Sequence, residues 1–178
     1  KAGLAELSNG KLVLATCRNN NDSDPTKKRF LIHVYESADL GLSWKEINKT
    51  PLFGKEPSLS AMANGTLVMS AQRGYFGPGS KSKESINMAR STDGGRTWDT
   101  YNLPGADYPR NMISERDGSL LFVRAVKSDW SFKGEGSPNL QLCRSKDGKT
   151  WTFTEGAVDW NLQAFGEGSA IRLKDGRL

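Results

Sequence analysis

The sequence has few of the residues that usually carry metal or nucleophilic chemistry. It holds one histidine, His33, and two cysteines, Cys17 and Cys143, in 178 residues. Because His33 falls inside a predicted strand, Phe30 to Tyr35, a His-based metal site and a Ser-His-Asp triad are both disfavoured. We expect His33 to be a packing or edge residue, and we expect neither a metal nor another cofactor. The cysteines fall on strands two repeats apart, too far for a disulfide, and are predicted to be small core residues.

Long apolar runs are also missing. The chain has no stretch of about 18 apolar residues, so no membrane span is expected in this segment. The net charge is +5, and the lysines and arginines are dispersed along the chain, which disfavours nucleic acid as a partner. No segment sustains the period of an amphipathic helix, so the predicted fold class is all-β.

One phrase occurs three times at a constant interval. Its form is Ser-x-Asp-x-Gly-x-(Ser/Thr)-Trp, and each serine follows the previous one by 54 residues, with the third copy one residue shorter. Such a period indicates one supersecondary unit stacked several times. We predict a structural role for the residues that define the phrase, with the tryptophans packed between neighbouring sheets. These residues are Ser37, Asp39, Gly41, Trp44, Ser91, Asp93, Gly95, Trp98, Ser145, Asp147 and Trp151.

A second phrase, Asn-Gly or Asp-Gly between short apolar runs, recurs at Gly10, Gly65, Gly118 and Gly176. It is the strongest local signal for a β-hairpin, because both central residues of the favoured turn need positive φ. In the second repeat the four predicted strands are 58–63, 67–72, 85–90 and 97–101. Four short antiparallel strands in about 50 residues match the size of a propeller blade. We predict blades at about 1–50, 51–104 and 105–160, with the start of a fourth at about 161–178.

Strand direction alternates, so we expect the repeated turns on one face of the propeller and the longer, variable loops on the other. Arg18, Arg73 and Arg124 each end a predicted second strand on the variable face. Converging guanidinium groups suit an anionic ligand, and Arg110, at the end of a link on the same face, is a further binding candidate. Alternatively, these arginines pair with nearby acids and only hold the loops in place.

Two acids share one repeat position on the variable face, directly before a first strand. They are Glu56 and Glu167. A carboxylate that points into a cleft near arginines is placed to orient or activate another group. An ordinary capping or ion-paired acid is the equally open alternative.

The Ser-x-Asp phrases resemble the BNR, or Asp-box, repeats of sialidases (neuraminidases), and the resemblance covers essentially the whole chain. It implies a β-propeller with six blades when complete, of which this chain would be an N-terminal-half fragment that is inactive alone. In that family three arginines bind the substrate carboxylate, an aspartate is the acid/base and a glutamate activates a tyrosine nucleophile. The tyrosine would lie outside this chain.

The resemblance carries over to particular residues of the first blade. The stretch Gly10 to Arg18 is similar to the family's segment that ends in a pocket arginine, which implies that Arg18 binds substrate. The polar loop that follows implies Asp24, or else Asp22, as the acid/base.

The activating glutamate has two competing assignments. Glu167 opens the fourth blade, where the family keeps this residue, but Gly168 follows it where the family has Pro or Cys. Glu56-Pro57, with Arg73 downstream, matches that phrase better but lies in the second blade.

The implied function is an exo-glycosidase that removes a terminal sialic acid or a related acidic sugar with retention, acting on sialylated or other acidic glycans. The same resemblance favours a secreted, periplasmic or cell-surface location. Non-catalytic propellers also carry Asp-boxes, so the alternative is a module that binds glycan or protein without turnover.

Overall fold

The computed structural model describes residues 2–19, 30–72, 87–103, 111–126, 139–155 and 171–177, with backbone only at 124–126, 139–141 and 155. Within these ranges the chain forms strands and no helix. That part of the chain therefore has no helix long and apolar enough to cross a membrane. The predicted all-β class is confirmed.

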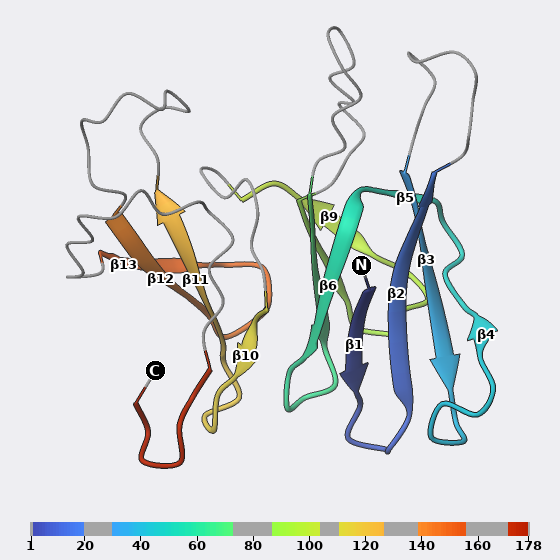
Figure 1. Cartoon of the computed structure of the whole chain (residues 1–178), viewed down its shortest axis with the longest axis horizontal. Helices are drawn as coiled ribbons and strands as arrows, with labels where there is room; N and C mark the ends of the chain where they lie inside the picture. The colour runs from blue at the N-terminus through green and yellow to red at the C-terminus, as the bar shows by residue number, and fades with distance from the viewer. Residues whose placement is uncertain are drawn as a thin grey trace, which may run out of the picture.

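The strands form three antiparallel sheets, each a meander in chain order (Figure 1). The first sheet holds β1 (Ala2–Glu6), β2 (Leu12–Asn19), β3 (Phe30–Ser37), β4 (Lys45–Glu46) and β5 (Leu52–Phe53). The second holds β6 (Lys55–Ala61), β7 (Leu67–Gln72), β8 (Met88–Ser91) and β9 (Asp99–Tyr101). The third holds β10 (Ile113–Ser114), β11 (Leu120–Val126), β12 (Asn139–Ser145) and β13 (Thr152–Glu155). In the first sheet β4 and β5 both pair with β3, and between them the Asn48 side chain accepts a hydrogen bond from Val34 N at 3.0 Å.

The Asn-Gly and Asp-Gly turns have the predicted backbone. Gly10, Gly65, Gly118 and Gly176 all have positive φ, between 79° and 89°. In the second sheet Met62 N donates to Thr66 O at 2.8 Å and closes the hairpin. All four turns lie at one end of the molecule, at the bottom of Figure 1, which we call the turn end. The opposite end, where β2 and β7 finish, is the loop end.

The strands of the second repeat match the prediction only in part. β7 spans Leu67–Gln72 as predicted, but β6 spans Lys55–Ala61 instead of 58–63. The ladder between β6 and β7 has an irregularity between Lys55 and Ser58, where one extra residue of β6 faces β7. Such a bulge has no glycine or turn signature in the sequence, so pattern reasoning missed it.

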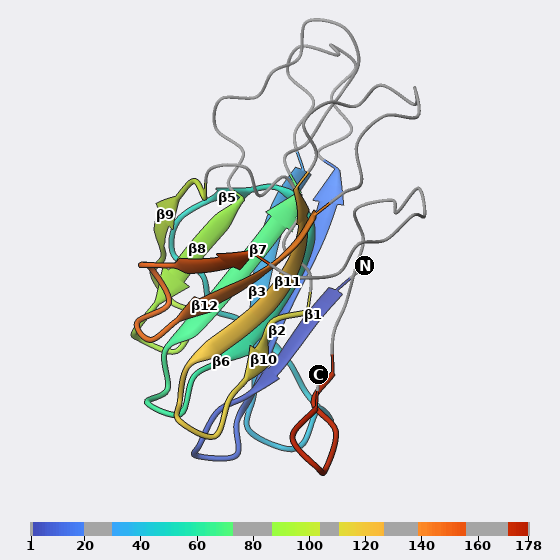
Figure 2. The ribbon, with the colours of Figure 1, turned by 90° about the vertical axis from the view of Figure 1, so that its left-hand side faces the viewer.

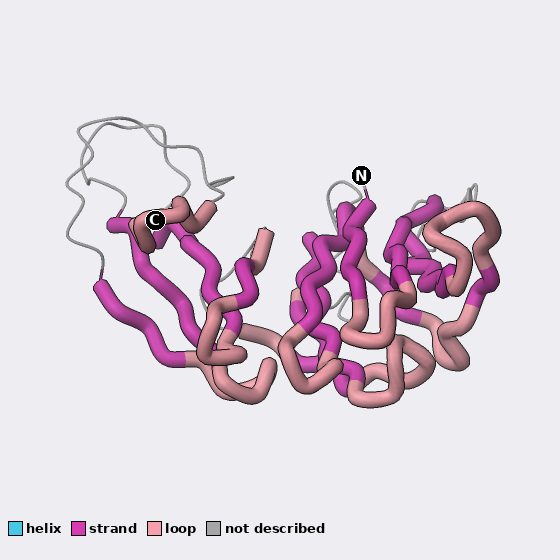
Figure 3. The backbone as a smooth tube through the Cα atoms, turned by 90° about the horizontal axis from the view of Figure 1, so that it is seen from below, coloured by secondary structure: helices cyan, strands magenta, loops and turns pink. Residues whose placement is uncertain are grey.

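The sheets pack face to face through two apolar layers (Figure 2). Alternate residues of β7 face opposite sides, because side chains in a strand point in turn to each face of the sheet. Leu67 and Met69 join a core with Val13 and Ala15 of β2. Val68 joins a second core with Phe122 and other residues of the third sheet. Figure 3 shows the three sheets side by side, with the second sheet between the other two.

The Ser-x-Asp phrases form a hydrogen-bonded turn, which we call the Ser-Asp turn, at 37–44, 91–98 and 145–151. In the second copy Ser91 Oγ donates to Asp93 Oδ1 at 2.8 Å and accepts from Gly95 N at 2.9 Å. Asp93 in turn accepts from Thr97 N at 2.9 Å and from Thr97 Oγ1 at 2.6 Å. Ser37 with Asp39, and Ser145 with Asp147, make the corresponding serine-to-aspartate bonds. The carboxylates are thereby committed to backbone and hydroxyl donors of their own turns.

The three tryptophans differ more than the repeat predicts. Trp98 Nε1 donates to Gly95 O at 2.9 Å, and its ring packs against the core between the first two sheets. Trp151 is only 8% exposed and lies in the second core. Trp44 is 37% exposed and is not buried between two sheets in the described part of the chain, contrary to the expectation for all three tryptophans.

The lone histidine and the cysteines take structural positions. His33 Nδ1 lies 2.7 Å from Glu46 Oε1 of β4, and its ring stacks on Tyr35. Cys17 is half-buried against the first core and Cys143 is fully buried in the second, and neither forms a disulfide. His33 was predicted to be a packing or edge residue, and it is a packing residue on the inner strand β3. The predicted small-core role of the cysteines agrees with their positions.

Candidate functional site

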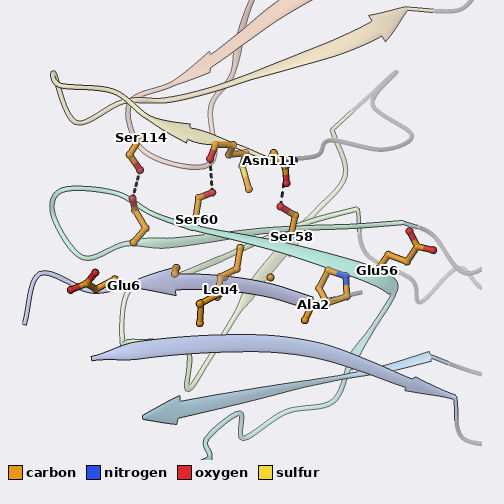
Figure 4. A pocket seen from close by; sticks show the side chains of 14 residues that line it. Ala2, Leu4, Glu6, Glu56, Ser58, Ser60, Asn111 and Ser114 are labelled. Carbon is orange, nitrogen blue, oxygen red and sulfur yellow. Dashed lines mark hydrogen bonds between the residues drawn. The ribbon is translucent and has the colours of Figure 1, made fainter. Parts of the chain in front are cut away.

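A groove runs between the innermost strands of the three sheets. It has a volume of about 620 Å³ and is lined by β1, β6 and the segment Asn111–Ser114 that contains β10. Figure 4 shows Glu56 toward one end of the groove and Glu6 toward the other. These two glutamates are the only charged residues among the described residues that line it.

The walls of the groove are held at short range. Gly3 of β1 lies so close to β6 that a Cβ there would be 2.5 Å from Leu59 N. On the other side three bonds join β6 to the third sheet, as Figure 4 shows. Ser60 Oγ donates to Met112 O at 2.8 Å, Asn111 N donates to Ser58 Oγ at 3.2 Å, and Ser114 Oγ donates to Ala61 O at 2.5 Å. The groove is therefore built from fixed backbone.

Glu56 is the most unusual residue of the groove. It sits in the β6 bulge with φ at 51°, in the left-handed region that a glutamate rarely adopts, and Pro57 follows it. Its backbone N donates to Cys17 Sγ at 3.3 Å, its carboxylate lies 3.9 Å from Lys55 Nζ, and its side chain is 19% exposed. A left-handed residue with a side chain costs about 1–3 kcal/mol, and such residues gather at functional sites. Bulges next to active sites likewise re-aim a side chain.

Asn111 lies shortly before β10, also lines the groove, and was not among the predicted site residues. Its φ is 47°, its side chain is exposed, and it stands 55 residues after Glu56. Counted back from the hairpin glycines Gly65 and Gly118, Asn111 corresponds to Ser58, so it does not share the repeat position of Glu56 and Glu167. No pattern in the sequence marks it, because a lone amide outside that repeat position does not indicate chemistry.

Arg18 and Glu56 both lie at the loop end, but on different sides of β2. Cys17 packs into the core between the first two sheets and accepts from Glu56 N, so its neighbour Arg18 must start from the opposite face of the sheet. Arg18 is exposed, and no described residue forms an ion pair with it. The described structure therefore does not bring Arg18 and Glu56 together.

Arg124 does not end its strand, contrary to the prediction. β11 continues to Val126, so Arg124 lies two residues inside it, paired with Gln141. The strand continues because its pairing with β12 runs as far as Asn139. The hairpin signal at Gly118 marks only where β11 begins, so it could not predict where the strand ends. The remaining predicted site residues lie outside the described residues: Asp22, Asp24, Arg73, Arg110 and Glu167.

The aspartates of the Ser-Asp turns have a different electrostatic setting from the groove. For Asp39 the Ser43 hydroxyl, Ser43 N and Ser37 hydroxyl lower the pKa to about 2. For Asp93 burial raises the pKa, but hydrogen bonds from Thr97, Ser91 and Arg96 N outweigh it and lower the pKa to about 2. Groups held ionised in this way are poor proton donors at neutral pH. Their geometry therefore fits the predicted structural role.

The groove is suited to a hydroxyl-bearing ligand. Its described lining offers serine hydroxyls, one carboxamide and two carboxylates, beside the small apolar side chains of β1. Carboxylates and amides accept hydrogen bonds from hydroxyls, and the amide also donates. Among the residues with described positions, no group of three or more His, Cys, Asp or Glu could hold a metal ion.

The chain resembles carbohydrate-active proteins in sequence and in fold. No protein-family model matches it. Over 83 residues it is 38% identical to the anhydrosialidase of Macrobdella decora, a match that takes in 39% of this chain and 11% of that protein. The Hadza microbial sialidase Hz136 has a TM-score of 0.55 at 22% identity, covering 85% of this chain and 36% of that one.

Two further solved structures have the same fold. The α-L-arabinofuranosidase Arb93A of Fusarium graminearum has a TM-score of 0.51 at 20% identity, covering 89% of this chain and 49% of that one. A Dyadobacter fermentans protein of unknown function has a TM-score of 0.53 at 20% identity, covering 89% and 54%. The chain thus spans about a tenth of the curated relative and from about a third to about half of the solved structures. The repeated four-stranded antiparallel sheets of this chain therefore have the fold of these solved structures, among them a sialidase.

Proposed function

We propose that the chain is part of a glycoside hydrolase that removes a terminal sialic acid, or a related acidic sugar, from glycoconjugates. One observation carries the proposal: a carboxylate, Glu56, is held in a strained bulge at the loop end of the groove. The similarity over 83 residues to an anhydrosialidase supports the sugar class. The relatives with the same fold include a second glycosidase, which supports hydrolysis of a glycosidic bond in general.

The proposed mechanism retains configuration through a tyrosine that lies outside these residues. Its oxygen attacks the anomeric carbon and passes its proton to a glutamate, while an aspartic acid protonates the leaving oxygen. Water then attacks the same carbon and gives its proton to the aspartate, while the departing tyrosine oxygen takes its proton back from the glutamic acid. A neutral phenol suits this reaction because a carbon that bears a carboxylate would repel an anionic nucleophile.

We propose the following roles within that mechanism. Asp24, or else Asp22, is the acid/base, and Arg18, Arg73, Arg110 and Arg124 are the candidates for binding the substrate. Of the two glutamates that compete as the activating base, Glu56 has the backbone strain and the groove in its favour. Glu167 has the place in the repeat that the resemblance implies. We further propose that each sheet is one blade of a propeller and that a fourth blade starts near residue 161.

The direct test is release of the fluorophore from a fluorogenic sialoside. The assay uses the chain as given and, in parallel, the complete gene product, with expected turnover by the complete product. Asp24→Asn and Glu56→Gln are each expected to lower kcat/KM at least about 100-fold, the usual share of a general acid or base. Glu6→Gln is the matched control, because it removes a carboxylate from the other end of the same groove.

Three outcomes would contradict the proposal in different ways. Cleavage of a fluorogenic arabinofuranoside, but not of the sialoside, would replace the acidic sugar and keep the hydrolase. Glycan binding without any turnover by the complete product would favour the non-catalytic module. Unchanged turnover in both Asp24→Asn and Asp22→Asn would remove the proposed acid/base.

A further inference from the structure

Two residues of the groove share an uncommon combination of features. Glu56 and Asn111 each stand next to the start of an innermost strand, each has positive φ without being glycine, and both line the groove. They lie at neighbouring innermost strands, although the strand register places Asn111 at the repeat position of Ser58 and not at that of Glu56. The third residue of this kind in the described chain, Leu40, lies in a Ser-Asp turn at a position where the next repeat has Gly94.

The comparison with Leu40 distinguishes positions that require only a left-handed backbone from positions that also require a particular side chain. Where only the left-handed backbone matters, glycine serves best, and the second Ser-Asp turn does use Gly94 with φ at 71°. Before the innermost strands the same backbone carries polar side chains, Glu56 and Asn111. The Asn111 carboxamide makes no hydrogen bond to any residue whose position is described, although Asn111 N is held by Ser58 Oγ at 3.2 Å.

We propose that Asn111 is a ligand-binding residue, and that its carboxamide contacts the neutral, hydroxyl-bearing part of a glycan in the groove. The inference deepens the proposed function and rests on it for the ligand class. Its backbone is fixed by the bond to Ser58 and its side chain is exposed at the groove, so the amide is presented to a ligand at little further cost in ordering.

Charge decides which part of the glycan is placed there. Among the described residues, the only charged ones that line the groove are Glu56 and Glu6, and both repel a ligand carboxylate. An amide can donate to one sugar hydroxyl and accept from another, and an adjacent carboxylate can accept from a third. The groove beside Asn111 therefore receives neutral hydroxyls, and the carboxylate of an acidic sugar must point away from it.

The test measures binding rather than activity and uses the complete gene product. Asn111→Gly keeps the left-handed backbone and removes only the carboxamide. Titration with 3′-sialyllactose and with lactose, followed by NMR and calorimetry, is expected to show about five- to tenfold weaker binding for this variant, the share of one neutral hydrogen bond. Leu40→Gly makes the same backbone change at the turn end and is expected to bind like the wild type.

The outcomes separate this inference from the proposed function. If 3′-sialyllactose binds and Asn111→Gly binds it equally well, the ligand role of Asn111 is overturned while the proposed function stands. If only lactose binds, and Asn111→Gly weakens it, the role of Asn111 stands and the acidic sugar fails. If neither sugar binds, or if Leu40→Gly weakens binding as much as Asn111→Gly, the inference fails.

Discussion

At the scale of single residues, backbone strain marks the groove more sharply than charge does. Charged side chains are spread over the whole chain, whereas the described residues include only three non-glycine residues with positive φ. Two of these three, Glu56 and Asn111, line the groove. Strain of this kind persists only where the surrounding structure fixes it, and here the bulge of β6 and the bonds to Cys17 and Ser58 do so.

Replacing Glu56 by glycine is predicted to separate stability from function. Glycine adopts positive φ freely, so Glu56→Gly should leave the free energy of unfolding unchanged or raise it by up to about 1 kcal/mol. Loss of the carboxylate should abolish the proposed sugar hydrolysis by the complete gene product. Urea unfolding and the sialoside assay measure the two effects, with Leu40→Gly as the control for the backbone change. A stability loss above about 1 kcal/mol would mean that the carboxylate of Glu56 is structural.

The turn aspartates predict a definite dependence of stability on pH. The pKa of Asp93 is about 2 in the folded chain, below that of a free aspartate, because its hydrogen bonds favour the ionised form. The folded state is therefore favoured by ionisation of Asp93. This stabilisation is complete above the unfolded pKa, near about 4, and disappears as pH falls toward 2.

Asp93→Asn should remove that part of the pH dependence. At neutral pH we expect a loss of about 1–2 kcal/mol, because the turn is exposed and its hydrogen bonds compete with water. Between about pH 4 and 2 the unfolding free energies of the variant and the wild type should converge. Urea titrations at several pH values measure this. Two curves that stay parallel through this range would contradict the role of the ionised carboxylate.

At the scale of elements, the shorter third Ser-Asp turn has repacked rather than lost its contacts. Trp151 Nε1 donates to Tyr101 OH of the second sheet at 2.9 Å. In the two longer turns the tryptophan Nε1 donates instead to a backbone carbonyl of its own turn. Tyr101 OH donates to Gly148 O at 2.7 Å, and burial raises the pKa of Tyr101 to about 12. In the turn that is one residue shorter, the tryptophan hydrogen bond therefore joins two sheets and does not close the turn itself.

Gly148 is predicted to be the least replaceable glycine of the described turns. It has φ at 73°, and a Cβ there would lie 2.5 Å from Val68 Cγ2 and 3.3 Å from Met62 Sδ. Gly148→Ala should cost about 2–4 kcal/mol, from the left-handed backbone and from overpacking. Gly10→Ala has a similar φ, 79°, and open space around it, so it should cost only about 1 kcal/mol. Denaturant unfolding compares the two, and equal losses would show that the contact with Val68 relaxes freely.

The elements that the sequence predicted best are those with a local cause. Asn-Gly turns need positive φ, and β7 follows such a turn and has the predicted ends. The β6 bulge and the end of β11 depend on pairing with distant strands, so no local pattern marks them. Of the residues that line the groove, Glu56 was among the predicted site residues because of its repeat position, while Asn111 was not, because an amide alone does not indicate chemistry.

At the scale of the whole molecule, the repeat explains which sheet faces are covered. Both faces of the second sheet are buried, Met69 against the first sheet and Val68 against the third. Leu14 of the first sheet holds the repeat position of Met69, and Trp44 that of Trp98, yet both are less buried than their counterparts. The apolar pattern of the first sheet is therefore that of a face made to be covered by another sheet, as in a propeller.

Gly3 brings β1 of the first sheet very close to β6 of the second. A Cβ at Gly3 would lie 2.5 Å from Leu59 N and 2.9 Å from Ser58 Cα, and these are backbone atoms that cannot rotate away. Ala5, two residues along on the same face, is buried with its Cβ accommodated, so the crowding is local to Gly3.

Gly3→Ala is therefore predicted to push β1 away from β6 and to widen the groove. Gly3 does not have positive φ, so alanine brings no backbone penalty and the whole effect comes from the contact. We expect a loss of about 2 kcal/mol or more in unfolding free energy. Amide hydrogen exchange should accelerate in β1 and β6 by more than it does in β11. Gly65→Ala, a turn glycine with open space around it, controls for the added methyl group. Unchanged unfolding free energy and unchanged exchange in Gly3→Ala would mean that β1 does not contact β6 at this point. The groove would then lack one of its walls, and Glu56 and Asn111 would not line one shared binding site.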